Sequence, residues 1–174
     1  MRKPFHIKYL ERPNETQILG RALALSNMVA LTGIEGAGKT SLVKEFVGKS
    51  EGSAKWFTLS NFLTLSTLLG FPEISSEEAL QKMLTALQNQ NSHTVVWDNL
   101  HFLNFQNQQK LIYSIINFGG NQAHIFISDE ALDLPTDIPQ ITIGGFSIKE
   151  IKAFFDLYET PMDEGQIEEV QVRK

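Results

Sequence analysis

The segment Gly33-Ile34-Glu35-Gly36-Ala37-Gly38-Lys39-Thr40 matches the phosphate-loop pattern at every fixed position. The short apolar run Met28–Leu31 comes just before it and predicts a buried strand. A helical pattern follows, from about Lys39 to Val47. This order of strand, glycine-rich loop and helix is typical of sites that hold a polyphosphate. We call residues 33–40 the phosphate loop and work outward from it.

The residue types of the phosphate loop suit a nucleotide. Three glycines let the backbone curl so that several N–H groups converge on one anion, and the helix adds its positive dipole end. Lys39 supplies a charge that reaches the terminal phosphates, and the Thr40 hydroxyl is placed to bind Mg²⁺. The alternative is a glycine loop that only turns the chain. The candidate nucleotide-binding residues here are Gly33, Glu35, Gly36, Ala37, Gly38, Lys39, Thr40 and Ser41.

Strand and helix patterns alternate along the rest of the chain. Further short apolar runs predict strands at Lys55–Leu59, Thr94–Trp97, His124–Ile127 and Ile138–Ile143. Helical patterns cover 14–26, with Asn14 as its cap, and 61–69, 76–89, 105–117 and 148–158, the last opened by a capping box from Ser147 to Glu150. This alternation predicts an α/β three-layer sandwich with a five-stranded, mainly parallel sheet.

Length, composition and charge narrow the possible classes of protein. The chain has 174 residues, of which 42% are hydrophobic and 20% charged, as in one folded domain rather than a disordered chain. Its net charge of −5 makes nucleic acid an unfavourable partner for this domain alone. It has no cysteine, which excludes disulfides and cysteine-bound zinc. We find no apolar run long enough for a membrane span and no secretory signal, and therefore expect a cytoplasmic protein.

A second motif supplies a carboxylate for the magnesium ion. The apolar run His93–Trp97 ends in Asp98, which is where a phosphate-loop enzyme places its metal-holding aspartate, the Walker B position. The alternative is an aspartate that caps a turn. We predict that Asp98 and Thr40 hold Mg²⁺. The next residue, Asn99, stands where a hydrolase usually has an acid; an amide orients a water but cannot accept its proton. Glu35, Glu130 and His101 are possible substitutes that nothing in the sequence requires.

The run Ile125–Ile127 is followed by Ser128, a hydroxyl residue that we predict to reach the terminal phosphate or the attacking water. The alternative is a serine in an ordinary strand-end turn. The arginines of the chain are Arg2, Arg12, Arg21 and Arg173, so none follows this strand. An arginine aimed at the terminal phosphate can be worth orders of magnitude in rate. We therefore expect the isolated chain to hydrolyse nucleotide slowly or not at all, with Asp98, Asn99 and Ser128 as its candidate catalytic residues.

Four segments follow one another in an order that a known class of ATPases shares: Tyr9–Glu15, Val29–Leu42, Val95–His101 and Ile141–Glu150. From about residue 9 to 160 the chain resembles the STAND class, signal-transducing relatives of the AAA+ proteins that include the NB-ARC and NACHT switches and large LuxR-type regulators. The resemblance implies a P-loop NTPase core of the ASCE/AAA+ type. It also implies ATP or ADP as the nucleotide and a place near that nucleotide for Arg12.

The chain departs from the class at two sites. Asn99 replaces a second acid, and Ser128-Asp129-Glu130 stands where the class often has Thr or Ser followed by Arg. Both departures concern catalysis and leave binding intact. The class continues with a helical lid. We therefore expect a P-loop nucleotide-binding domain at 1–160 and, at 161–174, the start of a helical lid or tail of a longer protein.

The resemblance favours a nucleotide-dependent signalling switch that a protein partner or adjoining domains read. The alternative is an AAA+ ATPase of the replication-initiator or clamp-loader type acting on DNA, because Asp98–Leu103 and Ile127–Asp129 resemble segments of replication initiators. The acidic charge and the missing arginines count against it. A small-molecule kinase needs an arginine-rich lid and a substrate acid, neither of which we find. A scaffold that binds nothing is disfavoured by the intact Lys39 and Thr40.

Overall fold

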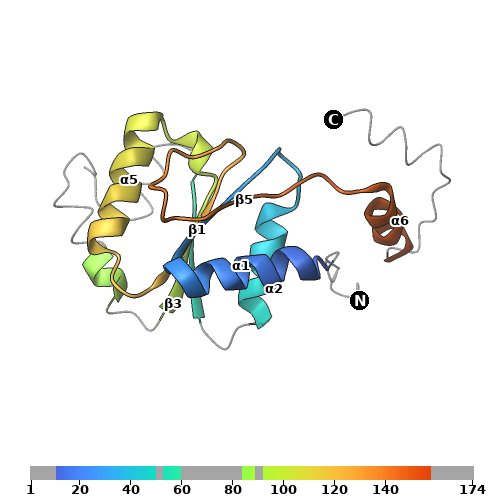
Figure 1. Cartoon of the computed structure of the whole chain (residues 1–174), viewed down its shortest axis with the longest axis horizontal. Coiled ribbons are helices and arrows are strands. Elements are labelled where there is room, and N and C mark those ends of the chain that lie inside the picture. The colour runs from blue at the N-terminus through green and yellow to red at the C-terminus, as the bar shows by residue number, and fades with distance from the viewer. Residues whose placement is uncertain (1–10, 50–52, 60–83, 89–91, 158–174) are drawn as a thin grey trace, which may run out of the picture.

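The computed structural model describes residues 11–49, 53–59, 84–88 and 92–157 (Figure 1). The strands are β1 (Met28–Thr32), β2 (Ser53–Thr58), β3 (Ser92–Asp98), β4 (Ala123–Ile127) and β5 (Gln140–Thr142). The helices are α1 (Pro13–Ser26), α2 (Lys39–Lys49), α5 (Phe105–Phe118) and α6 (Ile148–Leu157), with a 3-10 turn η1 (Leu100–Phe102). Residues 84–88 are also helical. The helix expected at 61–69, most of the one at 76–89 and the tail at 161–174 lie outside the described residues.

The strands form one parallel sheet in the order β2-β3-β4-β1-β5. This confirms the predicted five-stranded α/β fold. It also places β4 between β1 and β3, so the three strands that precede the candidate residues are direct neighbours. Because the carboxyl ends of parallel strands meet at one edge of the sheet, the segments after β1, β3 and β4 converge there.

Two apolar clusters cover the two faces of the sheet, since successive side chains of a strand point to opposite faces. On β3, Val95 and Trp97 join one cluster and Val96 joins the other. Helix α5 and residues 84–88 complete the first cluster, and α1 and α2 complete the second. Figure 1 shows α5 to the left of the strands and α2 to the right. The molecule is therefore the expected three-layer sandwich.

The last strand is shorter than its apolar run predicts. Ile138 donates its N–H to the carbonyl of Pro135 at 3.0 Å and so belongs to a turn. Pro139 has no N–H to donate, although its carbonyl accepts from Ala30 at 2.9 Å. Regular pairing with β1 therefore begins at Gln140, and the N–H of Ile143 still bonds to Thr32 at 2.7 Å. This bond holds the segment after β5 against the start of the phosphate loop.

Helix α1 begins differently from the prediction. Arg12, not Asn14, occupies the cap position, and Pro13 lies in the first turn. Proline is favoured there because the first N–H groups of a helix have no partner within the helix. The Arg12 side chain does not cap the helix. Asn14 is thus an ordinary residue of the first turn, and the chain enters α1 with the Arg12 side chain directed to other contacts.

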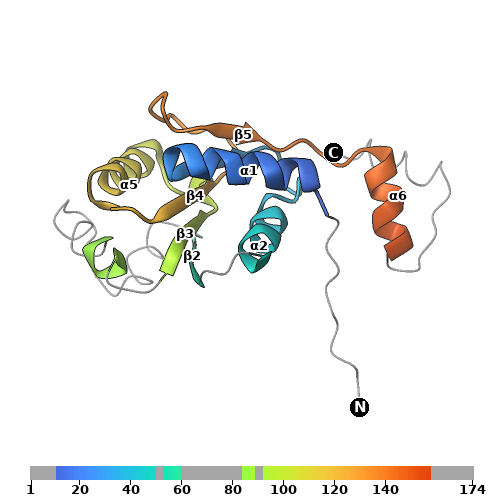
Figure 2. The same cartoon turned by 60° about the horizontal axis from the view of Figure 1, so that its bottom comes forward.

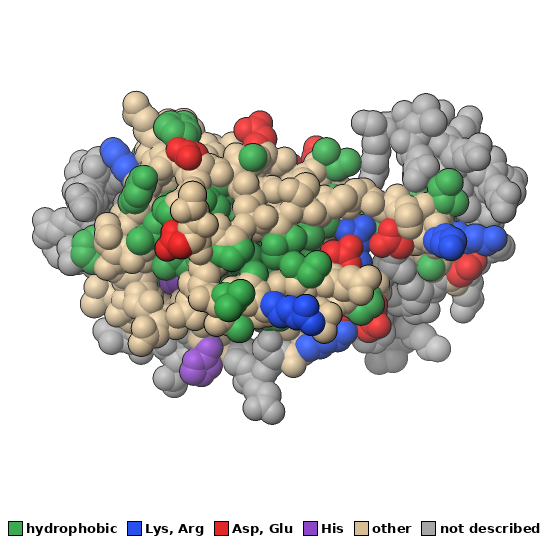
Figure 3. All heavy atoms as spheres, viewed as in Figure 1, with side chains coloured by type: hydrophobic (Ala, Val, Ile, Leu, Met, Phe, Trp, Pro, Cys, Tyr) green, Lys and Arg blue, Asp and Glu red, His purple; other side chains and the backbone are tan. Residues whose placement is uncertain are grey.

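Helix α6 stands apart from the sheet at one end of the molecule in both cartoon views (Figures 1 and 2). Hydrophobic side chains gather on the face that α1 covers (Figure 3), and Leu25 on α1 is 86% exposed. Within the described ranges, every helix is too short or too polar to cross a membrane.

Candidate functional site

The phosphate loop joins β1 to α2 and has the backbone of an anion cradle. Its glycines have φ values of 139° at Gly33, 76° at Gly36 and 87° at Gly38, which side chains disfavour. A Cβ on Gly33 would collide with the carbonyl oxygen of Ile143, and one on Gly38 would lie 3.2 Å from the Phe146 ring. Glycine is therefore required here by backbone conformation and by packing against the segment after β5.

Lys39 begins α2 and turns back over the loop. Its ammonium nitrogen donates to the carbonyl oxygens of Gly33 at 2.7 Å and Ile34 at 2.8 Å. It also forms an ion pair with Asp129, whose Oδ1 is 2.7 Å away. Lys39 is 5% exposed. Its charge is thus held in the loop by two backbone dipoles and one carboxylate.

Thr40 and Asp98 lie together as predicted. The Thr40 hydroxyl donates to the Asp98 carboxylate, with its oxygens at 3.1 and 3.2 Å. Burial raises the pKa of Asp98, and the hydrogen bonds from Thr40 and the Asn99 backbone oppose that rise. Hydroxyl and carboxylate oxygens are hard ligands of the kind that Mg²⁺ prefers. The pair fits a magnesium ion that arrives with the phosphates. In the described part of the chain, no group of three or more acidic, histidine or cysteine side chains gathers into a metal cluster of its own.

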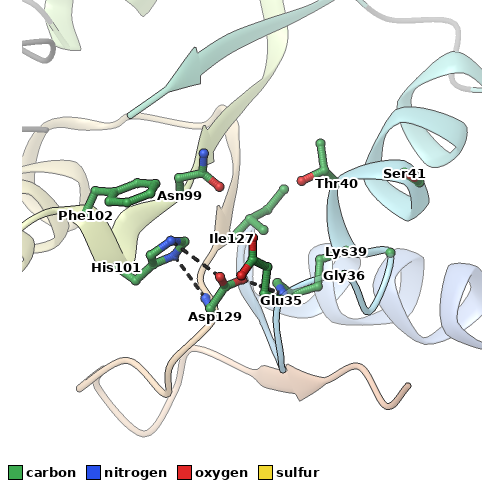
Figure 4. A pocket seen from close by; sticks show the side chains of 11 residues that line it. Glu35, Gly36, Lys39, Thr40, Ser41, Asn99, His101, Phe102, Ile127 and Asp129 are labelled. Atoms are coloured by element: carbon green, nitrogen blue, oxygen red, sulfur yellow. Dashed lines mark hydrogen bonds and ion pairs between the residues drawn. The ribbon is translucent and has the colours of Figure 1, made fainter. Parts of the chain in front are cut away.

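A pocket of about 430 Å³ opens over the loop (Figure 4). The segments after β1, β3 and β4 all contribute to its wall, as the strand order requires. Its lining residues are Glu35, Gly36, Gly38, Lys39, Thr40, Ser41, Asn99, His101, Phe102, Ile127 and Asp129. Of the residues predicted to bind nucleotide, Gly33, Ala37 and Arg12 are not in this lining. The carbonyl oxygen of Gly33 accepts a hydrogen bond from the lining residue Lys39, and Ala37 is fully buried.

Solved structures with a similar fold include ATPases of low sequence identity. The Walker-type ATPase PABY2304 of Pyrococcus abyssi matches with a TM-score of 0.55 and 15% identity over 93% of this chain and 62% of its own. A STAND protein with a tetratricopeptide repeat sensor, PH0952 from Pyrococcus horikoshii, has a TM-score of 0.58 and 16% identity over 93% of this chain and 27% of its own. PCH-2 of C. elegans has a TM-score of 0.53 and 14% identity over 80% and 44%.

The chain has the P-loop NTPase fold. No protein-family model matches its sequence. A search of curated proteins also finds no match. The chain spans less than two thirds of the length of these three P-loop NTPases. The likeness is thus one of fold.

Asn99 occupies a position where the backbone is left-handed. It follows β3 with φ 65° and ψ 43°, the left-handed conformation that asparagine tolerates better than most residues. Its side chain lines the pocket. The asparagine therefore suits the turn into η1. That turn brings His101 and Phe102 to the pocket wall, with ring centroids 4.4 Å apart.

After β4 the pocket is reached by Asp129 rather than by the predicted Ser128. Ser128 is fully buried, and its hydroxyl accepts the N–H of Glu130 at 3.1 Å, the turn contact stated as the alternative. Asp129 lines the pocket and forms an ion pair with Lys39. No local pattern singles out Asp129, because an acid next to a strand-end serine is unremarkable. The one available signal was its place after the strand next to the phosphate-loop strand.

Arg12 is not among the residues that line the pocket. Its guanidinium donates to the Gly144 carbonyl at 3.2 and 3.4 Å and lies 4.3 Å from the centre of the Phe146 ring. It is also 3.6 Å from Glu150 on α6. Arg12 is 4% exposed. The residue thus joins the start of α1 to the segment between β5 and α6, and so to the ring that packs on Gly38.

Proposed function

We propose that this chain binds ATP or ADP with Mg²⁺ in the pocket over the phosphate loop. One observation carries the proposal: a glycine cradle with three positive φ angles brings Lys39 and Thr40 to one pocket, and Asp98 is hydrogen-bonded to Thr40. A loop that only turned the chain would need none of these polar contacts. Backbone N–H groups and the start of α2 would hold the phosphates, and Thr40 with Asp98 would hold the metal.

The same proposal assigns the chain to nucleotide-dependent switching with slow or absent hydrolysis. Asn99 lines the pocket where an acid would activate water, and an amide cannot accept that proton. Among the described residues, Arg12 is engaged by Gly144 and Glu150, and Arg21 lies exposed on α1. A supporting arginine would then come from a protein partner or an adjoining domain. The domain at 1–160, followed by a lid or tail, is part of this proposal.

Action on DNA is the weaker candidate. The chain has a net charge of −5, and on the face shown in Figure 3 Lys and Arg lie beside Asp and Glu. A protein that holds DNA through its phosphates needs a surface of positive charge. We therefore favour a switch read by protein over an enzyme that acts on nucleic acid.

The test is calorimetric titration of the chain with ATP and with ADP in the presence of Mg²⁺. Lys39→Ala should lose binding of both, because the phosphates lose their counter-charge. Lys49→Ala, at the other end of α2 and paired there with Glu45, is the matched control and should bind as the wild type does. A melting curve for each variant checks that it folds. Equal binding by the wild type and Lys39→Ala would refute the site.

A further inference from the structure

We infer that Asp129 is a specificity-determining residue that makes the pocket favour a nucleoside diphosphate over a triphosphate. The inference rests on the proposed function and adds a selectivity to it. It starts from the ion pair between Lys39 and Asp129 inside the pocket (Figure 4). A carboxylate beside the phosphate-loop lysine competes with the phosphates for the same positive charge.

The contacts that Lys39 already makes cause this competition. An ammonium group has three N–H donors and no acceptor. The structure gives it two hydrogen bonds, to the backbone carbonyl oxygens of Gly33 at 2.7 Å and Ile34 at 2.8 Å, and an ion pair with Oδ1 of Asp129 at 2.7 Å. A phosphate that approaches Lys39 must therefore displace Asp129 or share the lysine charge with it.

His101 holds Asp129 in place from the other side. The N–H of Asp129 donates to Nδ1 of His101 at 3.2 Å, and Nε2 of His101 lies 3.5 Å from Oδ2 of Asp129. His101 is placed by η1, directly after β3. Figure 4 shows the Asp129 side chain between the imidazole and the lysine. Contacts on both sides keep the carboxylate at the pocket wall even when the lysine turns to a phosphate.

The negative charge of Asp129 affects the affinities for a diphosphate and a triphosphate differently. Release of Lys39 from Asp129 costs the same for any phosphate that takes the lysine. The carboxylate that stays at the wall also repels the phosphates, and a triphosphate brings more negative charge to the lysine that lies 2.7 Å from it. Like charges a few ångströms apart at a protein surface repel strongly enough to shift affinity by about tenfold or more. The carboxylate therefore disfavours a triphosphate more than a diphosphate.

The experiment compares the affinity for ADP with that for a non-hydrolysable ATP analogue, each with Mg²⁺, by calorimetry. The variant Asp129→Asn keeps the shape and removes the charge. It should raise affinity for the analogue by about tenfold more than for ADP. Asp129→Ser, which removes the charge with a smaller side chain, should shift the ratio in the same direction and covers a folding failure of the first variant. The control is Asp133→Asn, an exposed aspartate in the same segment and outside the pocket lining, which should leave the ratio unchanged.

The outcomes separate this inference from the proposed function. A ratio that shifts toward the triphosphate in both Asp129 variants and not in Asp133→Asn supports the inference. If the wild type binds both nucleotides and the Asp129 variants keep its ratio, the inference is overturned and nucleotide binding stands. If the wild type binds neither nucleotide, the proposed function fails and the inference fails with it.

Discussion

At the scale of single residues, the proposed magnesium site depends on one hydrogen-bonded pair. Thr40 begins α2 and Asp98 ends β3, and the hydroxyl donates to both carboxylate oxygens. Asp98 is 4% exposed, so its charge is costly without a partner. Burial raises its pKa for that reason. A bound Mg²⁺ would supply the missing compensation.

Asp98→Asn should therefore weaken the dependence of nucleotide binding on Mg²⁺ more than binding itself. The amide keeps the size of the side chain and an oxygen that accepts from Thr40, but it is a poorer metal ligand. We expect the gain in ATP affinity on adding Mg²⁺ to fall by about tenfold. Titrations with Mg²⁺ and with a chelator measure it, and Asp133→Asn again serves as control. An unchanged gain would remove Asp98 from the metal site.

At the scale of elements, the first turn of α6 carries both its capping box and an ion pair to the start of α1. The predicted capping box is confirmed: Glu150 accepts the N–H and the hydroxyl of Ser147, both at 2.7 Å, and its own N–H donates to the Ser147 hydroxyl at 3.3 Å. The backbone bond from Ser147 is the main reason that the pKa of Glu150 is lowered. Arg12 reaches the same carboxylate from the start of α1. The cap thus also links α6 to the segment that packs on the phosphate loop.

Ser147→Ala should loosen α6 and leave the sheet intact. The loss of a side-chain cap costs about 1 kcal/mol, so amide hydrogens of α6 should exchange about fivefold faster. Hydrogen exchange read by mass spectrometry measures this, with peptides from β1 and β4 as internal reference. Ser147→Thr keeps the hydroxyl and should retain protection. Equal protection in the alanine variant would show that the cap adds nothing to α6.

At the scale of the whole molecule, a buried histidine joins the centre of the sheet to α5. His124 on β4 is fully buried; its Nδ1 accepts from Trp97 on β3 at 3.2 Å, and its Nε2 lies 3.4 Å from the carbonyl of Gly119 after α5. These contacts fit a neutral ring with its proton on Nε2. Burial lowers the pKa of His124 from 6.5 to about 4.

The free energy of unfolding at acid pH should depend on the protonation of His124. As the pH falls from 6.5 toward 4, the unfolded chain binds a proton at His124 that the folded chain excludes. The free energy of unfolding therefore drops over this range, by at most about 3 kcal/mol from this group. Urea unfolding at several pH values measures the slope.

His124→Asn provides the comparison, because its amide oxygen can accept from Trp97 and does not titrate. This variant should start less stable at neutral pH, since it loses ring packing, yet lose less stability between pH 6.5 and 4 than the wild type does. Parallel slopes in the two proteins would show that His124 is not the group responsible.

The features predicted from sequence depend on local order along the chain. The backbone of the phosphate loop depends on the spacing of glycines within residues 33–40, between the strand before it and the helix after it. The strands could be read from apolar runs because both faces of the sheet are covered. The capping box from Ser147 to Glu150 is likewise a contact between near neighbours. In each case the physical cause lies within a few residues of its effect.

Only the tertiary structure decided which distant side chains share the pocket. Arg12 contacts Gly144 across 132 residues of sequence instead of lining the pocket. Asp129, rather than Ser128, reaches Lys39 because β4 lies beside β1 and its last residues leave the sheet by a turn. Side chains on adjacent residues point in different directions, so the turn after β4 decides whether Ser128 or Asp129 reaches the site. The local sequence thus determined the cradle and its lysine, and strand order together with turn geometry determined the carboxylate that faces them.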